Sequence, residues 1–247
     1  MRVEARYAGF PGFALGGYVA GVLAAGSRPG GALEVRLLRP VEIGTELERV
    51  ADGTELRSEG ERVATLQPTR LDLELPRTVT RAEAETASAA CLGLEHHFFA
   101  GCFCCGPGRP VGDGLRIFPG PVADAVLAAP WRAGDLSGEA NVPPEIVWSA
   151  LDCPGIWAHV LVTTGTGEKA VTGSLTVQQL RPAPARGTTL VLAWPIDHEG
   201  RKIRVGAALT TERGDLLAIA RQTLIVTDRG VPLDLEAWRA APAPSRA

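Results

Sequence analysis

The chain has no apolar run approaching the ~18 residues that a membrane-spanning helix needs. It also has no dense cluster of Lys and Arg, and its formal net charge is −3. Nucleic acid is therefore disfavoured as a partner, because its phosphates require concentrated positive charge. The N-terminal residues lack the apolar core and cleavage pattern of a signal peptide. These absences predict a cytoplasmic protein that binds neither membranes nor nucleic acid.

The cysteines do not fit a disulfide framework. There are five, an odd number, and three of them crowd into residues 102–105. Cys102 and Cys105 have C-x-x-C spacing and, with His96 and His97 nearby, supply one half of a zinc site. No second C-x-x-C or C-x-x-H follows downstream. The sequence therefore predicts no metal site, and we expect no cofactor.

The two halves of the chain share short matches in the same order. The matched pairs are Leu38–Pro40 with Leu180–Pro182, each followed by Gly-Thr, and Gly60–Ala64 with Gly214–Ala218. In each half an apolar helix led by glycine or proline precedes strand-like segments. The pattern predicts an α+β fold built from two repeats of a central helix wrapped by an antiparallel sheet, at residues 1–95 and 96–247. The 247 residues, 45% apolar, suffice for the cores of both units.

Local patterns predict the other elements. Residues 77–95 read as a helix, with a capping box formed by Thr80 and Glu83. The tail after Asp228 is expected to be frayed. Strands are predicted at residues 2–10, within 31–75, at 115–118 and 124–131, and within 169–227.

Residues 141–159 predict a buried helix that carries one carboxylate, Asp152. Asn141 is a suitable N-cap, and the two prolines that follow fit the first turn, where amides have no helical acceptor. Pro154 predicts a kink just past the acid. The first apolar helix, at residues 16–26, contains no acid. One site per chain is therefore expected, in the C-terminal half.

Asp152 shares a helical stripe with Trp148, Ile156 and His159. A lone carboxylate among apolar residues is costly unless it is paired or functional. One interpretation is a general base or nucleophile. The other is a hydrogen-bonded core residue that orders the kink. Cys153 follows directly and reads as an inert buried thiol, because no histidine is placed to activate it.

Alternation in the following strand supplies candidate partners for the acid. It places Thr172, Ser174, Thr176 and Gln178 on one face of residues 171–180, and we select Thr176 as the candidate hydroxyl. The alternative is an ordinary polar outer face. Gln222 interrupts an apolar series in the same way. It too is either a candidate partner for the acid or an ordinary polar residue of an outer sheet face.

These features resemble the hot-dog fold thioesterases in a double hot-dog arrangement. Asn141 and Asp152 match the pattern Asn-x-His-Gly-Gly-x-x-x-x-x-x-Asp of the phenylacetyl-CoA thioesterase-like branch, with residues 143–145 replacing His-Gly-Gly. Leu15–Gly17 resembles His-Gly-Gly without the histidine. The segment Cys102–Arg116 is similar to the lead-in of such domains.

The layout is also similar to type II acyl-CoA thioesterases, in which an Asp on the second helix works with a Thr or Ser and a Gln on the second sheet. Gly214–Gln222 resembles the strand that carries that Gln. The resemblance implies hydrolysis of an acyl-CoA or acyl-carrier thioester. Its implied catalytic residues are Asp152, Thr176 and Gln222, and its implied substrate contacts are Trp148, Ile156 and the amides of Glu145 and Ile146.

Other chemistries of this fold fit less well. Hydratases use Asp-x-x-x-x-His, but Trp157 occupies the histidine position, and dehydratases need a histidine where Pro143 stands. A non-catalytic acyl-CoA or lipid-binding protein stays open, because His-Gly-Gly is lost. A homodimer is expected from the sheet edges of this fold. The Ala, Gly, Pro and Arg richness suggests a bacterial source.

Overall fold

The computed structural model describes residues 1–27, 31–134, 140–162, 168–233 and 235–241. Its helices are α1 (Gly16–Ala24), α2 (Arg81–Ala89), α3 (Pro144–Ala150), α4 (Cys153–Val162) and α5 (Leu235–Arg239), with short 3-10 turns at Ala5–Tyr7, Ala51–Gly53 and Leu92–Leu94. Its strands are β1 (Ala8–Phe10), β2 (Phe13–Ala14), β3 (Ala32–Leu37), β4 (Glu48–Val50), β5 (Glu55–Ser58), β6 (Glu61–Thr69), β7 (Gly120–Ala123), β8 (Val126–Trp131), β9 (Lys169–Gln179), β10 (Thr189–Glu199), β11 (Lys202–Thr211), β12 (Leu216–Thr227) and β13 (Val231–Pro232). No helix in these described residues is long and apolar enough to cross a membrane.

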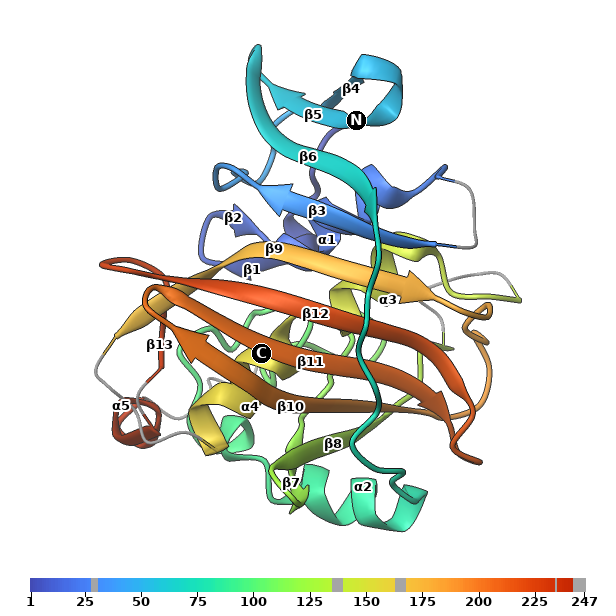
Figure 1. Ribbon diagram of the computed structural model, residues 1–247. Helices are drawn as coiled ribbons and strands as arrows, with labels where there is room; N and C mark the ends of the chain where they lie inside the picture. The colour runs from blue at the N-terminus through green and yellow to red at the C-terminus, as the bar shows by residue number, and fades with distance from the viewer. Residues whose placement is uncertain (28–30, 135–139, 163–167, 234, 242–247) are drawn as a thin grey trace.

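One antiparallel sheet of eleven strands forms the body of the molecule (Figure 1). Its order is β4-β5-β6-β3-β9-β12-β11-β10-β8-β7, with β13 pairing on β9. The two halves of the chain meet where β3 pairs with β9. Going outward from this seam, the N-terminal strands run β3, β6, β5, β4 and the C-terminal strands run β9, β12, β11, β10. In both halves, the strand at the seam is the first of these four strands along the chain, and the other three follow outward in reverse chain order.

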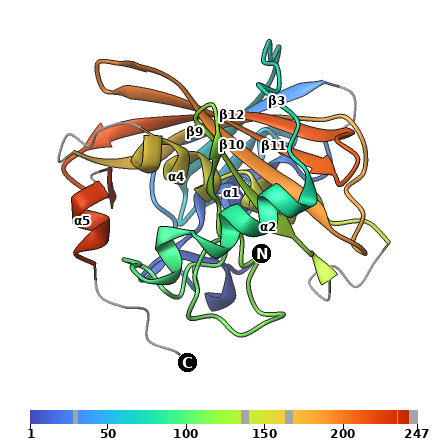
Figure 2. The ribbon, with the colours of Figure 1, turned by 90° about the horizontal axis from the view of Figure 1, so that it is seen from below.

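The apolar helices lie on the concave side of this sheet (Figure 2). α1 packs against β3 and β6, α4 packs against β10 and β11, and α3 packs against α1. The predicted α+β architecture, two central helical segments wrapped by one antiparallel sheet, is therefore present. The boundary near residue 95 stays a prediction. α2, which lies before that boundary, packs on β7 and β8 of the second half.

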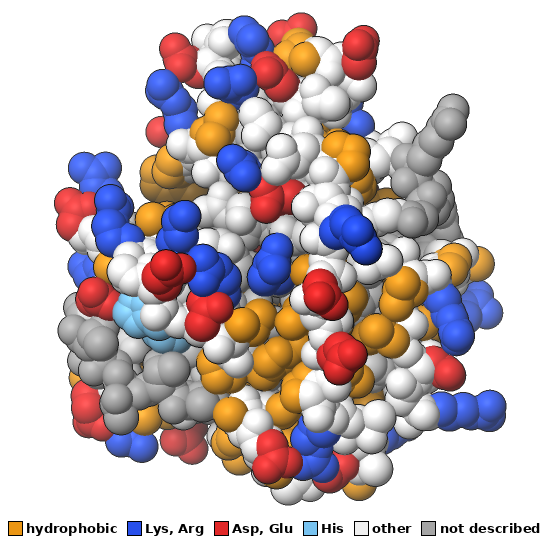
Figure 3. Space-filling model, in the orientation of Figure 1, with side chains coloured by type: hydrophobic (Ala, Val, Ile, Leu, Met, Phe, Trp, Pro, Cys, Tyr) orange, Lys and Arg blue, Asp and Glu red, His pale blue; other side chains and the backbone are white. Residues whose placement is uncertain are grey.

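The opposite face of the sheet is crossed by residues 70–79, the connection from β6 to α2 (Figure 1). Leu71, Leu73 and Leu75 pack there against a second, smaller core that includes Leu190 and Leu192 of β10. Figure 3 shows hydrophobic side chains gathered on the lower half of this face, with acidic and basic side chains around them. The connection thus covers apolar surface that this face would otherwise expose.

Several local predictions hold, and others are corrected. The Thr80–Glu83 capping box is confirmed, with both reciprocal hydrogen bonds present. Residues 2–10 hold a 3-10 turn and only the short strand β1, and residues 115–118 are not a strand. Beyond Asp228 the chain folds into β13 and α5, so the described part of the tail is ordered. Residues 242–247 lie outside the described residues.

Candidate functional site

Asp152 lies at a break between two helices. The helix predicted at residues 141–159, with a kink just past the acid, is instead two helices, because α3 ends at Ala150 and α4 begins at Cys153. Pro143, not Asn141, occupies the N-cap position of α3. Pro154 occupies the first turn of α4, where its missing N–H costs nothing. The break leaves the Asp152 side chain free to point between the two repeats, although the residue is only 2% exposed.

Three groups from three elements donate hydrogen bonds to the Asp152 carboxylate. The backbone N–H of Gly17, at the start of α1, donates to Oδ2 over 2.7 Å. The Thr172 hydroxyl, on β9, donates to Oδ1 over 2.9 Å. The Gln222 side-chain amide, on β12, donates to the same Oδ1. The carboxylate thereby links the N-terminal helix to two strands of the C-terminal sheet.

Gly17 reaches the acid because two glycines let α1 and α3 approach closely. A Cβ on Gly17 would lie 2.7 Å from the Cβ of Asp152 and 2.7 Å from the carbonyl oxygen of Trp148. One turn later, a Cβ on Gly21 would overlap the backbone of Glu145. Only glycine fits at such crossings. The N-terminal repeat therefore contributes an amide to the acid of the second repeat.

Gln222 is positioned by the pairing of β12 with β9. It lies opposite Leu175, whose side chain is buried, so both face the helices. Its Nε2 also donates to the Thr172 hydroxyl over 2.9 Å, which fixes the direction in which that hydroxyl donates. Gly155 of α4 leaves the room for this amide, since a Cβ there would overlap Gln222 Oε1. Gln222 is thus tied to both other members of the group.

The hydroxyl beside the acid belongs to Thr172 and not to Thr176. The β9–β12 pairing shifts register between Ser174 and Thr172, which leaves Gly173 as an extra residue. This bulge moves Thr172 to the helix-facing side, opposite the buried Leu224. Thr176 lies opposite Arg221 and faces the other side of the sheet. The structure therefore brings together Asp152 and Gln222 as predicted, but replaces Thr176 by Thr172.

The ionisation of Asp152 reflects two opposing influences. Burial raises the pKa of its carboxyl to about 6, while hydrogen bonds from Gly17 and Thr172 act to lower it. A carboxyl with this pKa is still mostly ionised at neutral pH. It is also a stronger base than an ordinary exposed Asp.

A mostly apolar cavity of about 380 Å³ opens at the carboxylate. Its volume falls within the ~300–1,000 Å³ range of small-molecule sites. Asp152, Thr172 and Gly16 line it on one side. Apolar and aromatic side chains line much of the remainder, among them Phe10, Val19, Phe99, Ile156, Trp157 and Trp238.

Only one of the four predicted substrate contacts lines this cavity. Ile156 does, whereas Trp148, Glu145 and Ile146 lie on α3, which packs against α1. The helix break is the reason, because a stripe through Trp148, Asp152 and Ile156 requires a helix that runs through Asp152, whereas the helix is interrupted at residues 151–152. The Ile146 amide donates to the Pro143 carbonyl within its own helical turn. Gly17, which the sequence did not single out as a site residue, provides the amide nearest the acid.

Comparison with known proteins identifies the fold. No protein-family model matches the sequence, and no curated protein matches it. Among solved structures, the chain is similar to a protein from Novosphingobium aromaticivorans described as a thioesterase, at 15% identity and a TM-score of 0.61, over 92% of this chain and 94% of that one. It is also similar to a protein from Thermobifida fusca described as a thioesterase II, at 19% identity and a TM-score of 0.55, over 92% and 91%. An acyl-CoA thioesterase II from Mycobacterium marinum matches at 13% identity and a TM-score of 0.57, over 86% and 88%. These likenesses confirm the predicted double hot-dog fold.

Proposed function

We propose that this protein hydrolyses an acyl thioester, with coenzyme A as the thiol carrier. The observation that carries the proposal is the buried Asp152 carboxylate. It is held by Gly17, Thr172 and Gln222 and lies at the edge of an apolar cavity. A carboxylate buried only for structure has no need of an adjoining cavity. The similar proteins described as thioesterases support the same reaction class.

In the proposed mechanism Asp152 acts as a general base on a water molecule at the cavity. The carboxylate removes a proton as the water oxygen attacks the thioester carbonyl carbon. The resulting tetrahedral oxyanion collapses and the carbon–sulfur bond breaks. Asp152 then returns its proton to the leaving sulfur, which departs as the free thiol. Thr172 and Gln222 orient the carboxylate and keep it ionised by hydrogen bonding to it.

The start of α1 is suited to bind the developing oxyanion. Gly16 lines the cavity and is the first residue of α1, so its N–H has no acceptor within the helix. The positive end of the helix dipole also favours negative charge at this position. We propose the Gly16 amide for the role that the sequence assigned to Glu145 or Ile146.

The cavity suits an acyl group, and its arginines suit a charged carrier. Arg39 and Arg229 line the cavity and are themselves exposed, so they lie where it opens to solvent. We propose that they face the phosphates of coenzyme A. Arg109 and Arg116 instead donate hydrogen bonds to backbone carbonyl groups of their own loop. A cytoplasmic location and a homodimer that covers the sheet edges remain part of the proposal.

The deciding experiment is a panel of short, aromatic and long acyl-CoA substrates, with release of free thiol as the readout. We expect turnover with at least one acyl class, and acyl groups too large for the cavity to react poorly. The rival function is a non-catalytic acyl-CoA or lipid-binding protein. Saturable binding measured by calorimetry, without thiol release on any member of the panel, would support that rival and end the enzymatic proposal.

The two threonines of β9 give a matched pair for testing the site. Thr172→Ala removes a hydrogen bond to a charged group, worth about 1.5–3 kcal/mol, so we expect kcat/KM to fall about 10- to 100-fold. Thr176→Ala removes a buried hydroxyl from the opposite face of the same strand, and we expect near-wild-type kcat/KM. Both variants are assayed on the best thioester of the panel. A larger loss in Thr176→Ala would contradict the site described.

A further inference from the structure

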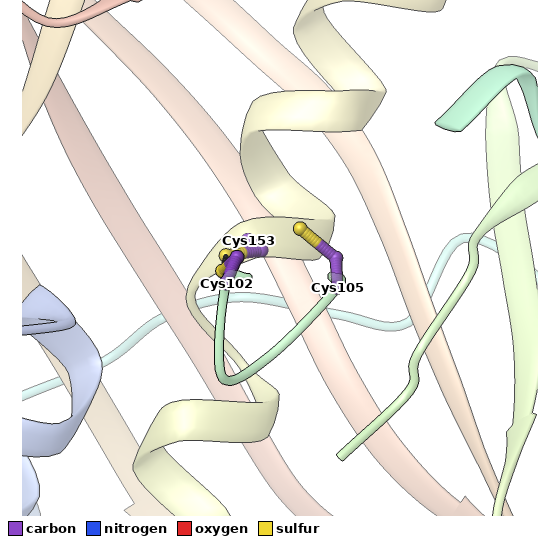
Figure 4. A group of neighbouring side chains, drawn as sticks. All are labelled: Cys102, Cys105 and Cys153. Atoms are coloured by element: carbon purple, nitrogen blue, oxygen red, sulfur yellow. Dashed lines mark hydrogen bonds between the residues drawn. The ribbon is translucent and has the colours of Figure 1, made fainter. Parts of the chain in front are cut away.

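Three buried cysteines converge beside the proposed active site. Cys102 and Cys105 lie on the loop before β7, and Cys153 begins α4, 51 positions after Cys102. Their sulfur atoms all lie within 4.8 Å of one another. Figure 4 shows Cys105 directing its sulfur toward the start of α4, where Cys102 and Cys153 meet. No other trio of His, Cys, Asp or Glu side chains converges as closely within the described ranges.

The spacing of the sulfurs matches a metal site. A tetrahedral zinc ion with bonds of about 2.3 Å to sulfur holds its sulfur ligands about 3.8 Å apart. Cys102 Sγ and Cys153 Sγ are 3.7 Å apart. Cys105 comes from the same C-x-x-C turn as Cys102, which is closed by a 2.9 Å hydrogen bond from the Gly106 amide to the Cys102 carbonyl. The three ligands could therefore enclose an ion with little movement of the backbone.

His97 is placed to hydrogen-bond to one of the three sulfurs. His97 Nδ1 accepts the Phe99 amide over 2.9 Å, which leaves the proton of the neutral ring on Nε2. That Nε2 lies 3.4 Å from Cys105 Sγ and can donate to it. Metal–thiolate sites commonly have such outer hydrogen bonds.

We propose that Cys102, Cys105 and Cys153 bind one thiophilic divalent cation, with Zn²⁺ as the best-fitting ion, and that the fourth ligand position faces the cavity. All three cysteines line that cavity. Binding replaces the thiol protons, which pass to solvent, by three metal–sulfur bonds. Three protein ligands with one open position are the arrangement of reactive zinc sites, whereas structural sites use four. The sequence predicted no metal because the third ligand, Cys153, is far from the C-x-x-C pair.

Cobalt is the probe, because thiolate-to-cobalt charge transfer reports the ligands directly and does not depend on thioester turnover. The protein is reduced and stripped of metal, and a denatured sample should then show five titratable thiols, which verifies that every cysteine is reduced. This protein is titrated with Co²⁺. We expect charge-transfer and tetrahedral absorption bands that saturate at about one Co²⁺ per chain and disappear on adding Zn²⁺. Cys153→Ser and Cys105→Ser should each weaken Co²⁺ binding at least ~10-fold.

Cys91→Ser is the matched control, because Cys91 is also buried but lies outside the trio. It should bind Co²⁺ as the wild type does. Circular dichroism melting verifies that each variant is folded. Wild-type protein without the charge-transfer band would overturn the proposal even if the variants fail to fold. An unchanged band in folded Cys153→Ser and Cys105→Ser would overturn it as well.

Discussion

Asp152→Asn is expected to lower kcat/KM for the best thioester by at least ~10²-fold, the lower range for removing a general acid–base group. Asn has nearly the same shape as Asp but cannot accept a proton from water at neutral pH. The loss should appear in kcat, because the apolar cavity that holds the acyl group is unchanged. Initial rates of thiol release for the two proteins make the comparison.

The stability of Asp152→Asn must be measured beside its rate. Burial of the charge disfavours the ionised form, so its removal offsets part of the cost of lost hydrogen bonds. We expect the free energy of unfolding to change by no more than ~1–2 kcal/mol. Asp152→Leu should destabilise more, because it leaves the Gly17, Thr172 and Gln222 donors without an acceptor at ~1–3 kcal/mol. A folded Asp152→Asn variant with wild-type turnover would show that Asp152 has only a structural role.

Gly17→Ala is expected to reduce both stability and turnover. The added methyl group would lie 2.7 Å from the Asp152 Cβ and 3.0 Å from the Ser149 Cα, so α1 and α3 must move apart. Such overpacking costs about 1–3 kcal/mol. The movement also withdraws the Gly17 amide from Asp152 Oδ2, and we expect kcat/KM to fall about 10- to 100-fold. Thermal unfolding and thiol release measure the two effects.

Gly21→Ala separates the two effects. Its methyl group would meet Glu145 and Trp148 at the same helix crossing, but one turn away from the acid. We expect a comparable loss of stability with a smaller loss of kcat/KM. If Gly17→Ala had the melting temperature and the kcat/KM of the wild type, the described close approach of α1 to Asp152 would be incorrect.

Local and periodic signals predicted part of this molecule. The Thr80–Glu83 box depends on neighbours within one turn, so sequence reveals it. The fold followed from short matches that keep their order between the halves and from the resemblance. Asp152 and Gln222 stood out because each interrupts an apolar series that the fold buries.

The remaining site depends on tertiary geometry. Gly17 meets Asp152 across 135 positions, through a helix crossing that no local pattern encodes. Period two placed Thr172 and Thr176 together, but one bulge at Gly173 puts them on opposite faces. A glycine inside a strand pattern is a known signal of a bulge and was available in the sequence. The predicted stripe of Trp148, Asp152 and Ile156 on one helix face is wrong for a similar reason, because the helix is interrupted at residues 151–152.

The most direct test of the account is the effect of Gln222→Ala on kcat/KM, measured once in the wild-type background and once in Asp152→Asn. Gln222 is assigned to act through the carboxylate that it hydrogen-bonds. We expect a loss of about 10- to 100-fold in the wild type and almost none in Asp152→Asn, because residues that work as one unit are not additive. An equal loss in both backgrounds would show that Gln222 acts independently of Asp152 and would contradict the proposed site.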